Sequence, residues 1–249
     1  MSKDAKQGVA ETIAAELRDA IERGEYRPGD QLPGENALIK DYGAARLTVR
    51  SALGMLQAEG LTTTRRGVGV FVRSFDPIVR NGISRVSARK WKAGRSVWDD
   101  ETRGRRPTVD HFEIVAEVDA PDDIAAILDS DDKVATRRRR YLLDDKPVIV
   151  ATSYLPAALV AGSQILAEDT GAGGIYARLA DLGHAPAHFR EDIVGRMPTK
   201  AESEELAMPA GTPVFVVTRT AVTESGDPVE VNVMVMDAGA YVLRYDFDA

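Results

Sequence analysis

The strongest constraint on this chain is the order of hydrophobic periods in its first 72 residues, where three helical stretches precede two short strands. Ile13, Leu17 and Ile21 recur every four residues and indicate a first helix, which Gly24 ends. A second, shorter helix is expected within Pro33–Gly43. This order leaves room for a compact helical domain that is closed by a β-hairpin.

The third helical stretch is Arg46–Glu59, and its apolar residues define an inward face. These residues are Val49, Leu53 and Leu56. Arg46 and Arg50 are four residues apart on the opposite face, roughly 5–6 Å apart at Cβ. Guanidinium groups bind guanine O6 and N7 in the major groove of DNA, and a hydroxyl such as that of Thr48 can contact a phosphate or a thymine methyl.

Two strand-like runs follow, Leu61–Thr64 and Val68–Val72, and a basic, glycine-containing tip joins them. Gly67 and Gly69 would let the backbone approach a narrow minor groove. Arg65 and Arg66 would contact phosphates or enter that groove. Three helices and a hairpin of this kind predict a winged helix-turn-helix over residues 1–75.

This segment closely resembles the DNA-binding domain of the GntR family of transcription regulators. The residues that carry the resemblance are Tyr26-Arg27-Pro28-Gly29-Asp30-Gln31-Leu32-Pro33, Asp41-Tyr42-Gly43, Arg46-Leu47-Thr48-Val49-Arg50, Glu59-Gly60-Leu61 and Arg66-Gly67-Val68-Gly69-Val70-Phe71-Val72. The resemblance implies operator DNA as a partner. Exposed arginine pairs are usually only a solvated surface, but their place in this ordered motif favours DNA contact.

Two departures from the family pattern lie at helix starts, where Gly34 and Ala45 replace the usual serine. Glycine is a tolerable N-cap, whereas alanine in place of serine costs about 0.5–2 kcal/mol. The lost hydroxyl would also remove a phosphate contact.

The net charge of −7 is unevenly distributed along the chain. Residues 1–110 carry 20 basic and 15 acidic side chains, whereas residues 111–249 carry 12 and 24. Nucleic-acid binding depends on the local field of a patch, so the acidic total does not exclude it. Residues 76–107 are basic and weakly periodic, and we interpret them as a linker with a part folded onto the second domain. An auxiliary DNA-contacting arm is the alternative.

Residues 108–249 alternate between strand and helix periods. The expected strands are His111–Val118, Val134–Leu143, Val148–Tyr154, Ala187–Met197, Pro213–Val222, Val229–Val235 and Val242–Phe247, and the expected helices are Pro121–Asp129, Gly174–Leu182 and Lys200–Ala207. Hairpins with interspersed helices predict an α+β fold with a mixed or largely antiparallel sheet.

This second segment resembles the UTRA effector domain of HutC-type GntR regulators, whose fold is similar to that of chorismate lyase. The matching residues are Arg139-Arg140-Tyr141-Leu142, Pro147, Ser153-Tyr154-Leu155-Pro156, Gly174-Ile175-Tyr176, Gly183-His184, Arg219, Gly226, Pro228-Val229-Glu230 and Tyr241. The resemblance implies a small-molecule effector in a cleft. It also implies the effector-binding candidates, which are Arg139, Tyr141, Thr152, Tyr154, Glu230 and Tyr241.

Strand alternation divides the arginine run 137–140 between two faces, with Arg137, Arg139 and Tyr141 on one side. Glu230 lies between two valines and would be a costly inward charge without a partner. An internal ion pair between Arg139 and Glu230 is the alternative to ligand binding. Members that bind sugar phosphates have a second arginine in place of Tyr141 and a serine in place of Gly174, so a less charged effector is expected.

We predict a regulator and not an enzyme, with no cofactor, metal or catalytic residue. The chain has no cysteine, and its three histidines are too far apart in the sequence for a recognisable metal set or triad. A chorismate-lyase-like enzyme, or a ligand-binding protein with only non-specific DNA binding, is the rival interpretation. No run of residues is long and apolar enough for a membrane span, so we expect a cytoplasmic repressor that dimerises through its second domains.

Overall fold

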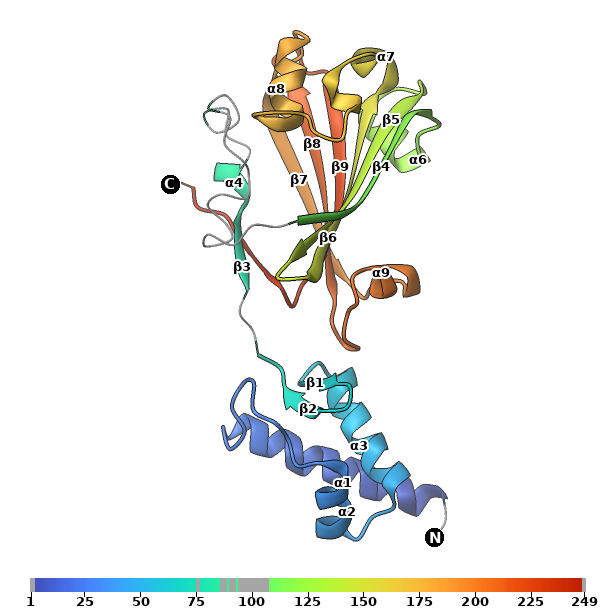
Figure 1. The fold of residues 1–249 in the computed structure, drawn as a ribbon, viewed down its shortest axis with the longest axis vertical. Coiled ribbons are helices and arrows are strands. Elements are labelled where there is room, and N and C mark those ends of the chain that lie inside the picture. Colours follow the sequence, from blue (N-terminus) through green and yellow to red (C-terminus); the bar gives the residue numbers. More distant parts are fainter. Residues whose placement is uncertain (1–2, 75–76, 86–88, 90–92, 94–107, 248–249) are drawn as a thin grey trace. The chain divides into compact units, whose positions relative to one another are not determined.

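The structure, a computed structural model, describes residues 3–74, 77–85, 89, 93 and 108–247 (Figure 1). It divides into two compact units. The first unit comprises residues 1–76 with residues 208–212, and the second comprises residues 77–207 with residues 213–249.

The first unit contains three helices and a two-stranded hairpin, as the periodicity predicts. The elements are α1 (Lys3–Glu22), α2 (Glu35–Tyr42), α3 (Arg46–Ala58), β1 (Thr62–Arg65) and β2 (Gly69–Val72). The helices bury Ile13, Leu38 and Leu56 in one shared core. The hairpin strands pair antiparallel, with Thr62 opposite Val72. This arrangement confirms the predicted winged helix-turn-helix.

Two glycines of this unit have a backbone geometry that other residues adopt with strain. Gly43 ends α2 in the left-handed conformation, with φ of 59°. Gly69 has φ of 148°, and a Cβ there would lie 2.4 Å from Nε2 of Gln31. The Gln31 amide donates a hydrogen bond to the Val68 carbonyl at 3.0 Å, and this bond stabilises the turn between β1 and β2.

The second unit contains a six-stranded antiparallel sheet in the order β4-β5-β6-β9-β8-β7. Its strands are β4 (Thr108–Val118), β5 (Val134–Leu143), β6 (Lys146–Pro156), β7 (Pro186–Arg196), β8 (Val214–Thr223) and β9 (Pro228–Asp237). Its helices are α4 (Gly82–Arg85), α6 (Asp122–Leu128), α7 (Ala157–Val160), η1 (Gln164–Leu166), α8 (Gly174–Asp181) and α9 (Lys200–Glu205). Two short strands, β3 (Ile78–Asn81) and β10 (Tyr241–Arg244), pair in parallel with each other outside this sheet.

Different elements pack against the two faces of the sheet. On the front face, which carries Ala135, Leu155 and Ala221, buried side chains of α7, η1 and α8 complete a hydrophobic cluster. The β3–β10 pair adds Ile78 and Tyr241 to a second cluster on the same face. The back face, which carries Val231 and Val233, packs against α6. The α+β fold class is confirmed, with a helical first unit and a sheet-rich second one.

Part of the expected linker, residues 76–107, lies within the described residues. Residues 78–85 form β3 and α4 within the second unit, and β10 pairs with β3 and not with the main sheet. β3 and α4 are too short for a hydrophobic period to identify them, whereas β10 overlaps the expected strand Val242–Phe247 and ends earlier, at Arg244. The parallel pairing of β3 with β10 joins residues far apart in the sequence. Residues 86–88, 90–92 and 94–107 of the expected linker lie outside the described residues.

The helix starts that depart from the family pattern generate a stability prediction. Gly34 and Ala45 are the N-cap residues of α2 and α3, and neither makes a side-chain capping bond. We expect Ala45→Ser to raise the free energy of unfolding of the first unit by about 0.5–2 kcal/mol, because the hydroxyl would accept a hydrogen bond from a free backbone N–H.

Gly34→Ser is the matched comparison at the other helix, and it should gain only a few tenths of a kcal/mol, since glycine already caps well. Urea denaturation followed by circular dichroism measures both changes. Equal effects of the two substitutions would contradict the capping interpretation.

Candidate functional site

The exposed start of α3 presents two arginines and a leucine. Arg46 and Arg50 are exposed as expected, and Leu47 between them is 79% exposed. Thr48, a predicted DNA contact, is instead only 7% exposed and faces the core. Leu47 was missed, although it lies about 200° around the helix from the inward-facing Val49. The candidate surface therefore consists of Arg46, Leu47 and Arg50.

Both arginines are held by residues at the start of α2. Arg50 Nε donates to both carboxylate oxygens of Glu35, at 2.9 and 3.0 Å. Arg46 donates to Oδ1 of Asn36 at 3.1 Å. These contacts restrain both guanidinium groups against the start of α2, which reduces the side-chain entropy lost on binding.

The hairpin tip presents the other predicted DNA contacts. Arg65 and Arg66 are exposed, and the Arg65 guanidinium lies 4.3 Å from the ring centre of Phe71. Gly67 is exposed at the turn with φ of 76°. Gly69 has a structural reason to be glycine, because Gln31 occupies the space of its side chain.

A cavity of about 180 Å³ opens on the front face of the second unit. Strands β5, β6, β8 and β9 and the start of α8 provide its walls. Its polar lining side chains are Arg137, Arg139, Tyr141, Ser153, Thr170, Tyr176, Arg219, Glu230 and Asn232. A wider hollow beside α7 is lined by exposed charged residues and small side chains, among them Glu117 and Lys133, without a buried polar group of the described residues. The front-face cavity is therefore the candidate effector pocket.

Two arginines of β5 give the pocket positive charge. Arg137 is 2% exposed and donates to the backbone carbonyls of Ile165 and Ala167, while Arg139 donates to the carbonyl of Glu168 at 2.6 Å. No carboxylate of the described residues forms an ion pair with either guanidinium. Burial, together with the nearby positive charge of Arg139, lowers the pKa of Arg137 to about 10.

Glu230 lies in the same pocket and is 2% exposed. Its Oε2 atom has no hydrogen-bond partner among the described residues. Burial raises the pKa of this carboxyl group, against the lowering effects of Ser153 and Arg219. A ligand hydroxyl would satisfy the free oxygen.

The structure brings together three of the six effector-binding candidates, namely Arg139, Tyr141 and Glu230. Thr152 and Tyr154 lie on the back face, where they line a separate cavity of about 150 Å³ with Arg138. The cross-strand register explains the separation, since Thr152 stands opposite Arg138 whereas Ala151 stands opposite Arg139. Tyr241 is buried in β10 within the hydrophobic cluster of Ile78.

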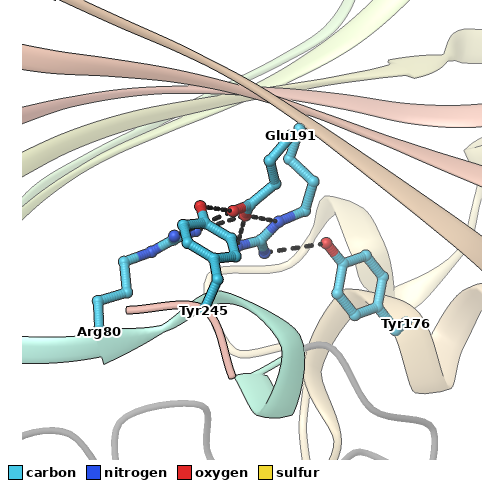
Figure 2. A network of polar contacts seen from close by, with 5 residues as sticks. Arg80, Tyr176, Glu191 and Tyr245 are labelled. Atoms are coloured by element: carbon cyan, nitrogen blue, oxygen red, sulfur yellow. Dashed lines mark hydrogen bonds and ion pairs between the residues drawn. The ribbon is translucent and has the colours of Figure 1, made fainter. Parts of the chain in front are cut away.

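Sequence reasoning missed a buried polar network behind the pocket (Figure 2). Arg219 of β8 donates to Glu191 of β7 at 2.6 and 2.8 Å, and its third nitrogen lies 3.4 Å from the Tyr176 hydroxyl. Arg80 of β3 donates to the same carboxylate. A signal was available, because Arg219 and Glu191 each occupy an inward position between hydrophobic residues of their strands.

The structure does not suggest a metal site or a membrane span in the part of the chain that it describes. No cluster of three or more histidine, aspartate or glutamate side chains there could hold a metal ion. No helix in that part is long and apolar enough to cross a membrane.

Comparison with known proteins agrees with this arrangement. Residues 9–72 match the gntR family of bacterial regulatory proteins, and residues 102–241 match the UTRA domain. The chain belongs to the GntR family. It is therefore a transcription regulator that binds DNA through its helix-turn-helix and an effector through its UTRA domain, and not the lyase-like enzyme of the rival interpretation.

Relatives of this GntR protein match it over most of its length. The HTH-type regulator SCO4628 of Streptomyces coelicolor, itself uncharacterised, is 30% identical over 94% of this chain and 91% of the relative. The HTH-type transcriptional repressor NagR of Bacillus subtilis is 26% identical over 88% of this chain and 86% of its own. A crystal structure of a GntR-family regulator shares the fold, with a TM-score of 0.64, 24% identity and coverage of 97% and 98%.

The raised pKa of Glu230 generates a prediction about stability and pH. Above the ordinary glutamate pKa of 4.5, the unfolded chain loses a proton that the buried carboxyl group retains, so this residue lowers stability as pH rises. We expect Glu230→Gln to gain stability relative to the wild-type protein as pH rises above that value, as measured by urea denaturation.

Glu224→Gln is the control, because Glu224 is exposed in the turn between β8 and β9. Its stability difference from the wild type should stay constant with pH. Parallel pH profiles for the two variants would show that Glu230 is ionised in the folded protein.

Proposed function

We propose that this regulator, of the HutC type, represses transcription as a homodimer and that a small hydroxylated anion in the front-face pocket controls its operator affinity. Two observations together carry the proposal: an exposed basic helix start in the first unit, and a pocket in the second unit whose Arg137 and Arg139 form no ion pair with a carboxylate of the described residues. NagR, which matches most of the chain, is a repressor, which supports repression here.

Operator contact is assigned to the exposed residues of α3 and the hairpin tip. Arg46 and Arg50 would bind guanine edges, while Leu47 offers an apolar contact to a thymine methyl. Arg65, Arg66 and Gly67 would contact phosphates and the minor groove. Thr48 and Gly69 support these residues from within the domain.

The effector class follows from the charges of the pocket. Arg137 and Arg139 both point a guanidinium group at the pocket without a carboxylate partner among the described residues, and the α8 start, Gly173–Ile175, also lines it. A helix start and arginines favour an anion. The single free oxygen of Glu230 favours a hydroxyl group beside that anion. We therefore favour an anionic effector over the less charged one that the departures at Tyr141 and Gly174 imply.

Dimerisation would match the two-fold symmetry of operators that helix-turn-helix proteins bind. The edge strand β4 supports it, because Val109, Val115 and Val118 are 43%, 36% and 37% exposed there. We place this function in the cytoplasm, where bacterial operator DNA lies. Effector binding would change the relation of the two DNA-binding domains, so that the half-site spacing no longer fits.

Operator binding is testable by titrating the protein into labelled DNA from its own upstream region, with random DNA as competitor. We expect specific binding that falls steeply with salt, because phosphate contacts release counterions. The substitutions Arg46→Ala and Arg50→Ala should each cost about 1–3 kcal/mol of specific binding.

Arg23→Ala is the matched control, since Arg23 is exposed but follows α1, away from the predicted contacts along the chain. It should leave specific binding unchanged. Equal, weak binding of all variants to every DNA would contradict sequence-specific repression.

The effector class is testable by thermal unfolding with inorganic phosphate, glucose and glucose 6-phosphate. A ligand that binds the folded state raises Tm, so both phosphates should raise it and glucose should not. Arg139→Met should weaken phosphate binding roughly tenfold or more, because it removes a charge-assisted hydrogen bond.

Arg138→Met is the matched control, because Arg138 is the next residue of β5 but faces the back of the sheet and pairs with Glu205. It should leave the effect of phosphate intact. A Tm rise with glucose alone, or no rise with either phosphate, would overturn the anionic class.

A further inference from the structure

One buried carboxylate joins the effector pocket to strand β3. Glu191 contacts Arg219, which lines the pocket, and Arg80, which lies on β3 (Figure 2). The side chains of Arg80, Arg219 and Glu191 are 0%, 6% and 9% exposed. All three charges are thus removed from water, where their mutual interactions are strong.

The two arginines share the same oxygen atom of Glu191. Arg219 donates Nε and Nη2 to Oε1 of Glu191, and Arg80 donates Nη2 to this same Oε1 at 2.5 Å. Arg80 also donates Nη1 to Oε2 at 3.1 Å, and the Tyr245 hydroxyl donates to Oε2 at 2.8 Å. Whatever weakens the hold of Arg219 on Oε1 leaves this oxygen to Arg80.

Two guanidinium groups and one carboxylate leave an excess of positive charge in the cluster. Burial by itself raises the pKa of Glu191, but Arg80 and Arg219 together lower it to about 2, so the carboxylate is ionised at neutral pH. An anion that enters the pocket would supply the second negative charge that the cluster lacks.

Strand β3 is the first element of the second unit along the chain, and residues 75–76 connect it to the DNA-binding unit. It is held by parallel pairing with β10 and by the buried Arg80. The Tyr245 ring packs against Gly82, the residue that follows β3, since a Cβ there would lie 2.2 Å from its Cε1 atom. The side-chain contacts of Arg80 and Tyr245 therefore converge on Glu191.

We propose that Glu191 is a positioning residue that couples occupancy of the pocket to the anchorage of β3. An anion that binds Arg219 releases Oε1 of Glu191 to Arg80, and β3 is then held more tightly at the point where the chain enters the effector domain. This inference rests on the proposed effector pocket. It goes further, because it names the side chains through which the pocket reaches the connection to the DNA-binding unit.

Hydrogen exchange of the full-length protein with inorganic phosphate tests the coupling. In the wild type, we expect phosphate to slow exchange of the amides in residues 78–81 roughly fivefold or more, the lower end of coupling between linked sites. In Glu191→Gln, phosphate should still raise Tm, but exchange in these residues should no longer respond. A full response in Glu191→Gln would overturn the proposal.

A second experiment uses no ligand. It distinguishes coupling between the pocket and β3 from a purely structural role of the network. Arg219→Met leaves the whole carboxylate to Arg80, so exchange in residues 78–81 should become slower than in the wild type, with β5 and β6 amides as the check on folding. A purely structural role of the network predicts faster exchange there, because a buried side chain has been lost. Faster exchange would therefore overturn the coupling.

Tyr245→Phe provides a milder variant that keeps both arginines. It removes one hydroxyl donor to Glu191 at a residue that is 38% exposed, and exchange in residues 78–81 should become roughly two- to tenfold faster. Unchanged exchange would show that Glu191 does not anchor β3. If phosphate fails to bind the wild type, the anionic effector class is wrong, while the two ligand-free variants still decide the role of Glu191.

Discussion

The effector domain depends on burying charged side chains on one face of its sheet. Successive side chains of a strand point to opposite faces, so the four consecutive arginines of β5 have to be divided between the front and the back. Arg137 and Arg139 therefore point to the front face, where Arg137 is buried and Arg139 is partly buried. Backbone carbonyls of the segment after η1 accept their hydrogen bonds. The conformation of that segment and the positive charge of the pocket therefore depend on each other, because its backbone carbonyls hold both arginines in place.

The same face carries a second set of buried charges that is arranged differently. Arg80, Glu191 and Arg219 come from three segments that are distant in the sequence, and they form ion pairs with one another. A buried ion pair contributes little net stability compared with well-packed apolar residues. Its value here lies in specificity, because it defines which strand contacts which, and it makes the position of β3 sensitive to charge on the pocket side.

Much of this architecture was predictable from local patterns. The helix that carries Leu53 and Leu56, and the strands that carry Arg139 and Glu230, follow from hydrophobic periods and glycine stops. The alternation of side chains along a strand was sufficient to place Arg137 and Arg139 on the same face. Thr152 and Tyr154 show what local patterns cannot predict. Strand alternation places them on the opposite face from Ser153, but which of the two faces lines the pocket depends on the register with β5. The same holds for β3, whose four residues give no period, and for its pairing with β10, which is far away in the chain.

The glutamate shared by two arginines also constrains how this protein can change through evolution. Loss of either arginine alters the charge balance around a buried carboxylate, and loss of the carboxylate leaves two buried cations facing each other. Single substitutions at Arg80, Glu191 or Arg219 therefore cost stability. Replacing all three by apolar residues would instead leave no buried charge without a partner. Descendants that dispense with the network should have lost it as a set, and a lineage that keeps one member should keep all three.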